Sequence, residues 1–160
     1  MKPRVYIETT IASAYHETRS DAETIARRNW TRRWWDTKRD EVEAVTSDAV
    51  IDELEAGEYP HQAEALEMIR GIPQVPFNEH IADIVAAYIQ HRVMPANPNG
   101  DALHLALASY HRCDFLVTWN CRHIANANKF AHIRRINDTL GLFVPTLITP
   151  LELLAEGVTP

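Results

Sequence analysis

Cysteine, glycine and long apolar runs are scarce in this chain of 160 residues, which contains two cysteines and five glycines. Cys113 and Cys121 have seven residues between them, a spacing that suits neither a C-x-x-C redox pair nor a zinc knuckle, so we expect two thiols without a redox or metal role. No run of about 18 apolar residues is present, and the first residues lack the apolar region of a signal peptide. We therefore expect no membrane segment and a cytoplasmic protein.

Positive charge is also in short supply, because 16 lysines and arginines face 22 aspartates and glutamates and leave a net charge of −6. This balance argues against a protein that coats nucleic acid, since such binding depends on cations that neutralise phosphates. It does not exclude a nuclease, because a bound divalent cation reverses the local field of an acidic site. Six of the 16 cations lie between Arg27 and Arg39, so one segment is strongly basic.

The length and the hydrophobic fraction of 46% predict one domain, residues 1–160, with its own core. Short β-prone segments alternate with amphipathic ones, and this order predicts an α/β fold: a mainly parallel central sheet of about four to five strands with helices on both faces. Ser20 and Glu23 predict a capping box at the start of a long helix, and Thr149 and Glu152 predict another near the end of the chain. The expected strands are residues 4–8, 42–46, 73–77, 114–118 and 143–148, and the expected helices are 9–15, 20–39, 47–57, 60–70, from Asn78 to a loop at 94–100, 101–111, within 124–140, and after Thr149.

Polar side chains follow the expected strands in four separate segments. Glu8 ends the first strand, Glu53 lies in the helix after the second, Asp101 opens an apolar helix, and Asn120 follows the strand at 114–118. Parallel strands place such loops at one edge of the sheet. Three carboxylates about 5 Å apart would repel by about 3 kcal/mol per pair at a dielectric near 20. A divalent cation removes that cost, and oxygen ligands of this kind suit Mg²⁺ or Mn²⁺.

Each of these residues also has a purely structural interpretation. Asp101 could cap its helix, Glu53 could be one of several solvated acids on its helix, and Asn120 could form a strand-end turn. His123, three residues after Asn120, could be an ordinary half-buried histidine. Glu8 is the hardest to explain structurally, because it directly follows the apolar residues "VYI".

Four stretches together, "VYIETTIASAY", "SDAVIDELEAG", "GDALHLALAS" and "FLVTWNCRHIAN", resemble the PIN-domain ribonucleases, in particular the VapC-like toxins of toxin–antitoxin pairs. The resemblance spans nearly the whole chain. It implies a parallel α/β fold whose clustered acids hold one or two Mg²⁺ or Mn²⁺ ions and hydrolyse RNA phosphodiester bonds. By position it implies that Glu8, Glu53 and Asp101 are the acidic ligands, with Thr10 near the first and Asn120 at the fourth acidic place. Two departures are Glu8, where the family usually has Asp, and Asn120, which replaces an acid.

The resulting hypothesis is a metal-dependent endoribonuclease. The catalytic residues would be Glu8, Glu53, Asp101 and Asn120, and Asn120 would hydrogen-bond a metal-bound water molecule or the scissile phosphate. Arg122 or His123 would contact RNA or the leaving group, and Thr10 would contact RNA. The resemblance also implies a cognate antitoxin protein and a homodimer. The alternative is a catalytically weak PIN-like module that acts by binding RNA or a protein partner, and it is motivated by Glu8 and Asn120. The helix at 20–39 has a basic face formed by Arg28, Arg32, Trp35 and Arg39. This helix could bind RNA, receive an antitoxin peptide, or pack Trp30 and Trp34 into the fold.

Overall fold

The computed structural model of the chain describes residues 1–95 and 100–155, and part of the predicted loop at 94–100 lies outside them. Within the described residues four strands form one sheet in the order β2-β1-β3-β4. Every neighbouring pair is parallel, which confirms the predicted α/β fold. All four carboxyl ends therefore lie at one edge. The strands are β1 (Arg4–Ile7), β2 (Glu43–Val45), β3 (Phe115–Val117) and β4 (Thr146–Ile148).

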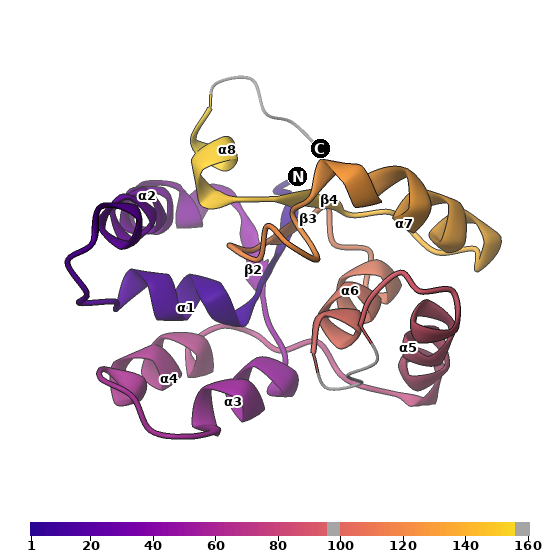
Figure 1. Cartoon of the computed structure of the whole chain (residues 1–160), viewed down its shortest axis with the longest axis horizontal. Helices are drawn as coiled ribbons and strands as arrows, with labels where there is room; N and C mark the ends of the chain where they lie inside the picture. The colour runs from indigo at the N-terminus through magenta and orange to yellow at the C-terminus, as the bar shows by residue number, and fades with distance from the viewer. Residues whose placement is uncertain (96–99, 156–160) are drawn as a thin grey trace.

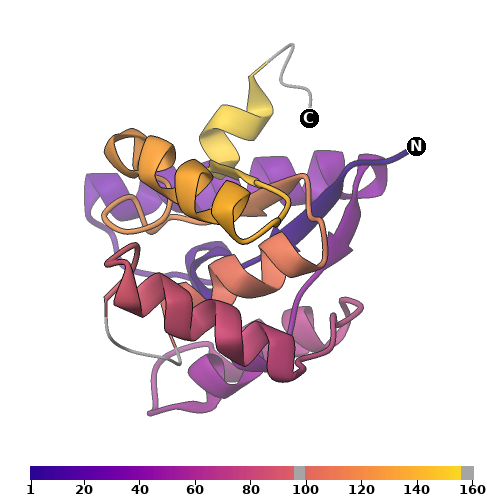
Figure 2. The ribbon, with the colours of Figure 1, turned by 90° about the vertical axis from the view of Figure 1, so that its right-hand side faces the viewer.

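Helices cover both faces of the sheet, as the alternating pattern predicts (Figure 1). Figure 1 shows α1 to α4 on one side and α5 to α7 on the other, and Figure 2 shows α5, α6 and α7 in front of the sheet. Among the described residues, no helix is long and apolar enough to cross a membrane. The helices are α1 (Thr9–Tyr15), α2 (Ala22–Lys38), α3 (Asp48–Glu55), α4 (Gln62–Arg70), α5 (Glu79–Gln90), α6 (Asp101–Tyr110), α7 (Ala127–Thr139) and α8 (Pro150–Leu154), with a 3-10 turn, η1, at Arg39–Glu41.

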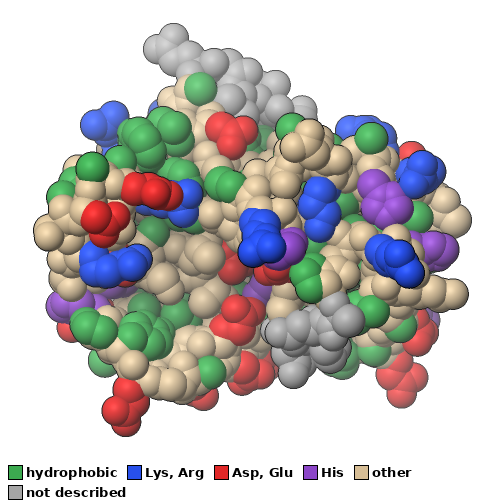
Figure 3. Space-filling model, in the orientation of Figure 1, with side chains coloured by type: hydrophobic (Ala, Val, Ile, Leu, Met, Phe, Trp, Pro, Cys, Tyr) green, Lys and Arg blue, Asp and Glu red, His purple; other side chains and the backbone are tan. Residues whose placement is uncertain are grey.

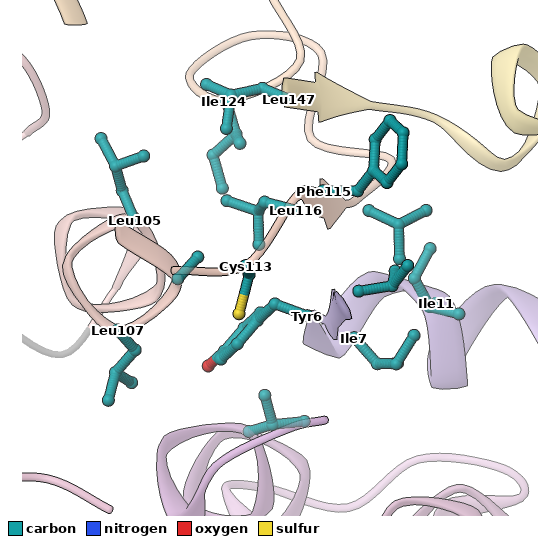
Figure 4. Close-up of a cluster of buried hydrophobic side chains, with 14 of the residues drawn as sticks. Tyr6, Ile7, Ile11, Leu105, Leu107, Cys113, Phe115, Leu116, Ile124 and Leu147 are labelled. Atoms are coloured by element: carbon teal, nitrogen blue, oxygen red, sulfur yellow. The ribbon is translucent and has the colours of Figure 1, made fainter. Parts of the chain in front are cut away.

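The core is built around the two central strands, β1 and β3, whose apolar side chains are almost entirely buried. Successive side chains of a strand point to opposite faces. In Figure 4, Tyr6 accordingly points toward α6, which contributes Leu105 and Leu107, whereas Ile7 lies on the side of α1, which contributes Ile11. The ends of β1 and β3 are thus fixed by packing on both faces, and the polar residues that follow them inherit that position.

One predicted strand is wrong. Residues 73–77 form no strand, and only an isolated bridge joins Thr46 to Gln74. Two backbone hydrogen bonds accompany it, from Thr46 N to Pro73 O and from Val75 N to Thr46 O. Pro73 and Pro76 have no N–H group to donate, so the ladder cannot continue on either side of the bridge.

Two details of α2 also differ from the prediction. The N-cap is Asp21, not Ser20, and its carboxylate accepts from Thr24 N at 3.1 Å. Trp35, which the sequence pattern places on the basic face, is 8% exposed, and Arg39 lies over its ring at 5.3 Å. The aliphatic part of a long cationic side chain can cover an aromatic ring while its charge stays in water.

The helix starts predicted at Asn78 and Thr149 are confirmed. Asn78 accepts from Ile81 N at 3.2 Å, and Thr149 forms a complete capping box with Glu152.

Candidate metal site at the edge of the sheet

Glu8 follows β1 directly and caps α1, which explains how a carboxylate comes to lie at the end of an apolar strand. The residue is 3% exposed. Its Oε2 atom accepts from Thr10 Oγ1 at 2.6 Å, from Thr118 Oγ1 at 2.6 Å and from Thr10 N at 3.3 Å. All three bonds use Oε2, so Oε1 has no hydrogen-bond partner among the residues that the structure describes. The two threonines, from α1 and from the end of β3, fix the direction of the carboxylate.

Glu53 on α3 meets His104 on α6 across the carboxyl edge. The Nε2 atom of His104 is hydrogen-bonded to Glu53 Oε1, and its Nδ1 atom lies 2.8 Å from the hydroxyl of Tyr6. That hydroxyl lies 2.7 Å from Ser47 Oγ. Tyr6, Ser47 and His104 are all buried, so a buried chain of hydrogen bonds runs from the sheet to the carboxylate of Glu53.

Three side chains therefore converge. Glu8, Glu53 and His104 each offer one ligand atom, and these atoms all lie within 4.8 Å of one another. Figure 3, in the orientation of Figure 1, shows acidic side chains gathered near the centre of the visible face, with Lys and Arg beside them. The sequence interpretation expected the two glutamates here but missed His104. A signal was available, because His104 lies three residues after Asp101, and residues at that spacing share one face of a helix.

Asp101 is the first residue of α6, and the N-cap of the helix is Gly100. The interpretation of Asp101 as an N-cap is therefore wrong. Its carboxylate lies outside the group formed by Glu8, Glu53 and His104. It is nevertheless close enough for its charge to raise the pKa of His104, as expected for an acid one turn away on the same helix.

The electrostatics of the group favour a positive charge between the two glutamates. Burial raises the pKa of Glu8, although the charge of His104 and the hydroxyls of Thr10 and Thr118 counter part of this rise. Burial alone would lower the pKa of His104, but the hydrogen bond to Glu53 and the charges of Glu8, Glu53 and Asp101 outweigh it and raise that pKa. A cation at this point thus relieves both the desolvation and the mutual repulsion of the carboxylates.

The loop after β3 begins with a turn made by Asn120. Asn120 Oδ1 accepts from Arg122 N at 3.2 Å and from His123 N at 3.0 Å, and Asn120 N donates to Thr118 Oγ1 at 2.9 Å. The structural interpretation of Asn120 as a strand-end turn is therefore correct for its oxygen. Because Thr118 also binds Glu8, this turn is tied directly to the candidate metal site.

Two charged or titratable residues, Arg122 and His123, follow in the same loop. Arg122 is exposed. His123 is half-buried and lines a hollow of about 480 Å³ together with Arg92, Met94 and Lys129. Neither residue belongs to the group of converging ligand atoms found among the described residues. A second hollow, of about 380 Å³, adjoins the site at Thr10 and contains Ser13, Arg27 and Trp119.

Comparison with known proteins adds one finding. A family model described as PIN domain matches residues 5–129, a range that begins in β1 and ends at the start of α7. It includes every residue placed above at the carboxyl edge of the sheet. A search of curated proteins finds no match to the chain.

Proposed function

The chain belongs to the PIN-domain family, and from this premise we propose that it is an endoribonuclease that depends on Mg²⁺ or Mn²⁺. PIN domains are typically nucleases that use divalent metal ions. The observation that carries the proposal is the convergence of two buried or half-buried carboxylates, Glu8 and Glu53, at the carboxyl edge of the sheet. We also propose that the domain spans residues 1–160, since β4 at 146–148 adds a strand beyond the matched range.

The residues at this edge fit a hard divalent cation. Carboxylate oxygens are the ligands that Mg²⁺ and Mn²⁺ prefer, and the remaining oxygen of Glu8 is unused by the threonines that hold the other one. In the proposed site Glu8, Glu53 and Asp101 hold the ion. A bound divalent cation would supply positive charge against the developing charge of the phosphate and make a water molecule a better nucleophile.

The surrounding residues have distinct roles in this proposal. Thr10 and Thr118 keep the carboxylate of Glu8 in one orientation. Because the oxygen of Asn120 is used by its turn, the amide NH₂ remains, and as a donor it suits a phosphate oxygen of RNA. The Arg122 and His123 side chains would contact the RNA further along the loop, and Thr10 would contact it at the hollow beside α1.

The basic segment of α2 has a structural task that sequence alone left open. Arg28 donates to Glu17 O at 3.2 Å, and Arg32 donates to Tyr15 O at 2.8 Å, so two of its cations tie α2 to the end of α1 and to the residues just after it. Trp34 is 1% exposed and packs in the core. These contacts favour packing over RNA binding for this helix.

We further propose that the enzyme is the VapC-like toxin of a toxin–antitoxin pair, a homodimer that is bound by a cognate antitoxin in the cytoplasm. The support is the resemblance of the four sequence stretches to that branch of the family.

The test of the proposed activity is RNA cleavage by the purified chain with Mn²⁺ and with EDTA. Replacing Glu53 with Ala should abolish metal-dependent cleavage without unfolding the domain, because it removes a ligand that is a third exposed and does not fill the core. Asp52→Ala is the matched control, since Asp52 is an exposed carboxylate on the same helix. Unchanged cleavage by the Glu53→Ala variant would remove Glu53 from the mechanism.

A second candidate function is a catalytically weak PIN-like module that binds RNA or a protein partner. It is favoured by the Asn120 oxygen, which is occupied in a turn at the place where the family has an acid. Calorimetric titration with Mn²⁺, paired with the cleavage assay after removal of any copurifying partner, separates the two. An inert module would bind little Mn²⁺ and leave RNA intact.

A further inference from the structure

His104 faces the two glutamates with a ring nitrogen, and nothing in the proposed nuclease mechanism uses that nitrogen. The ring is 1% exposed, and its ligand atom lies within 4.8 Å of those of Glu8 and Glu53. Two ligands of one ion can be separated by at most twice the metal–ligand distance, which is about 4 Å for bonds of roughly 2.1 Å. Small side-chain rotations would bring all three atoms to one ion.

The opposite ring nitrogen is held as it is in metal-binding histidines, which generally bond their second nitrogen to a fixed partner. Here the partner is the Tyr6 hydroxyl, 2.8 Å from Nδ1, with Ser47 Oγ 2.7 Å further on. Hydroxyl groups donate and accept, so His104 Nδ1–H can donate to Tyr6, and Tyr6 O–H can donate to Ser47. In that arrangement Nε2 gives up the hydrogen that it shares with Glu53 and offers its lone pair to an ion held between the carboxylates.

We propose that His104 Nε2 is a direct ligand of the divalent ion, beside Glu8 and Glu53. This inference rests on the proposed function, because it assumes that the two glutamates hold such an ion. The competing role is structural: Nε2 would keep its hydrogen and only donate to Glu53.

A nitrogen ligand has a consequence for the choice of metal. Mg²⁺ prefers oxygen donors and keeps much of its water, whereas Mn²⁺ and the later divalent metals accept imidazole more readily. The site therefore prefers Mn²⁺ to Mg²⁺, and that preference depends on His104. A residue that only positions Glu53 would affect the binding of both ions alike.

The direct test is pulsed electron paramagnetic resonance of Mn²⁺ bound to the full chain. A histidine ligand gives ¹⁴N modulation of the echo, and labelling with ¹⁵N-histidine should change its frequency without any mutation. We expect the modulation in the unmodified protein and in the His123→Gln control, and its loss in His104→Gln. Bound Mn²⁺ without nitrogen modulation would overturn the inference but leave the proposed nuclease intact. Failure of the unmodified protein to bind Mn²⁺ would overturn both.

Affinities provide an independent readout. In His104→Gln, Mn²⁺ binding should weaken by at least about 10- to 100-fold, the loss that is typical when only the partner behind a ligand is removed, while Mg²⁺ binding changes much less. Tyr6→Phe keeps the imidazole and removes only the hydroxyl behind it, so nitrogen modulation should persist with weaker Mn²⁺ binding. Equal losses for Mn²⁺ and Mg²⁺ in His104→Gln would contradict direct ligation.

Discussion

Replacing Thr118 with Val tests whether the end of β3 holds Glu8 in place. The Thr118 side chain is fully buried; its hydroxyl donates to Glu8 Oε2 at 2.6 Å and accepts from Asn120 N at 2.9 Å. Valine has nearly the same shape, so the substitution removes these two hydrogen bonds and leaves the packing unchanged. Thr118→Ser is the matched control, because it keeps the hydroxyl and loses only a methyl group.

The magnitudes of the two losses differ. A hydrogen bond to a charged group contributes about 1.5–3 kcal/mol, and a neutral one about 1 kcal/mol. Water can partly replace the bond to Asn120 N, because Asn120 is half-buried. The two losses together should lower the free energy of unfolding of Thr118→Val by about 3 kcal/mol. Thr118→Ser should lower it by about 1 kcal/mol, the contribution of one buried methyl group.

Urea unfolding in the presence of EDTA measures both variants without interference from metal binding. With a slope near 2 kcal/mol per M for a chain of this size, the midpoint of Thr118→Val should lie about 1 M below that of Thr118→Ser. The difference between the two midpoints should become smaller in acid, because a protonated Glu8 accepts a weaker hydrogen bond from Thr118 than an ionised one. If Thr118→Val is as stable as Thr118→Ser at pH 7, the hydroxyl does not hold an ionised Glu8 and the reasoning fails.

Three further predictions concern stability. Burial raises the pKa of Glu8 above its unfolded value, so the charge of Glu8 destabilises the metal-free fold at neutral pH. Glu8→Gln should therefore raise the melting temperature in EDTA at pH 7. An increase in melting temperature that persists below about pH 4, where Glu8 is protonated in both states, would contradict this cause. Tyr88 donates to Asn137 Oδ1 at 2.6 Å in the core. Tyr88→Phe leaves that oxygen unpaired and should lower the free energy of unfolding, measured in urea, by about 2 kcal/mol. An unchanged free energy of unfolding would show that the Asn137 oxygen finds another donor. Thr149→Ala removes the capping box of α8 and should cost about 1 kcal/mol, whereas Thr149→Ser should cost less.

Sequence patterns predict most of the fold here because each signal is local. The apolar stretches at β1 and β3 and the caps at Asn78 and Thr149 depend on residues within a few positions of one another. The strand predicted at 73–77 is wrong for a different reason. Val75 and Phe77 favour a strand, but the two prolines beside them limit pairing to a single bridge, and pairing depends on the partner strand.

In the candidate site, too, the sequence identifies some residues better than others. Glu8 is recognisable because a carboxylate directly after an apolar strand needs partners. His104 is harder to recognise, because it is one polar residue in an apolar helix, and its spacing of three residues from Asp101 is the signal that the sequence offers. The structure places His104 in the group of ligand atoms and leaves Asp101 out of it, a difference that residue spacing alone does not predict.

The central claim is that side chains from separate segments of the chain meet around one divalent cation. A crystal soaked in Mn²⁺ and measured at the manganese absorption edge tests it directly. We expect an anomalous peak in contact with the carboxylates of both Glu8 and Glu53, at about 2.2 Å from the ligand atoms. A crystal in which manganese is absent from this edge of the sheet, or in which it contacts only one of these glutamates, would contradict the account.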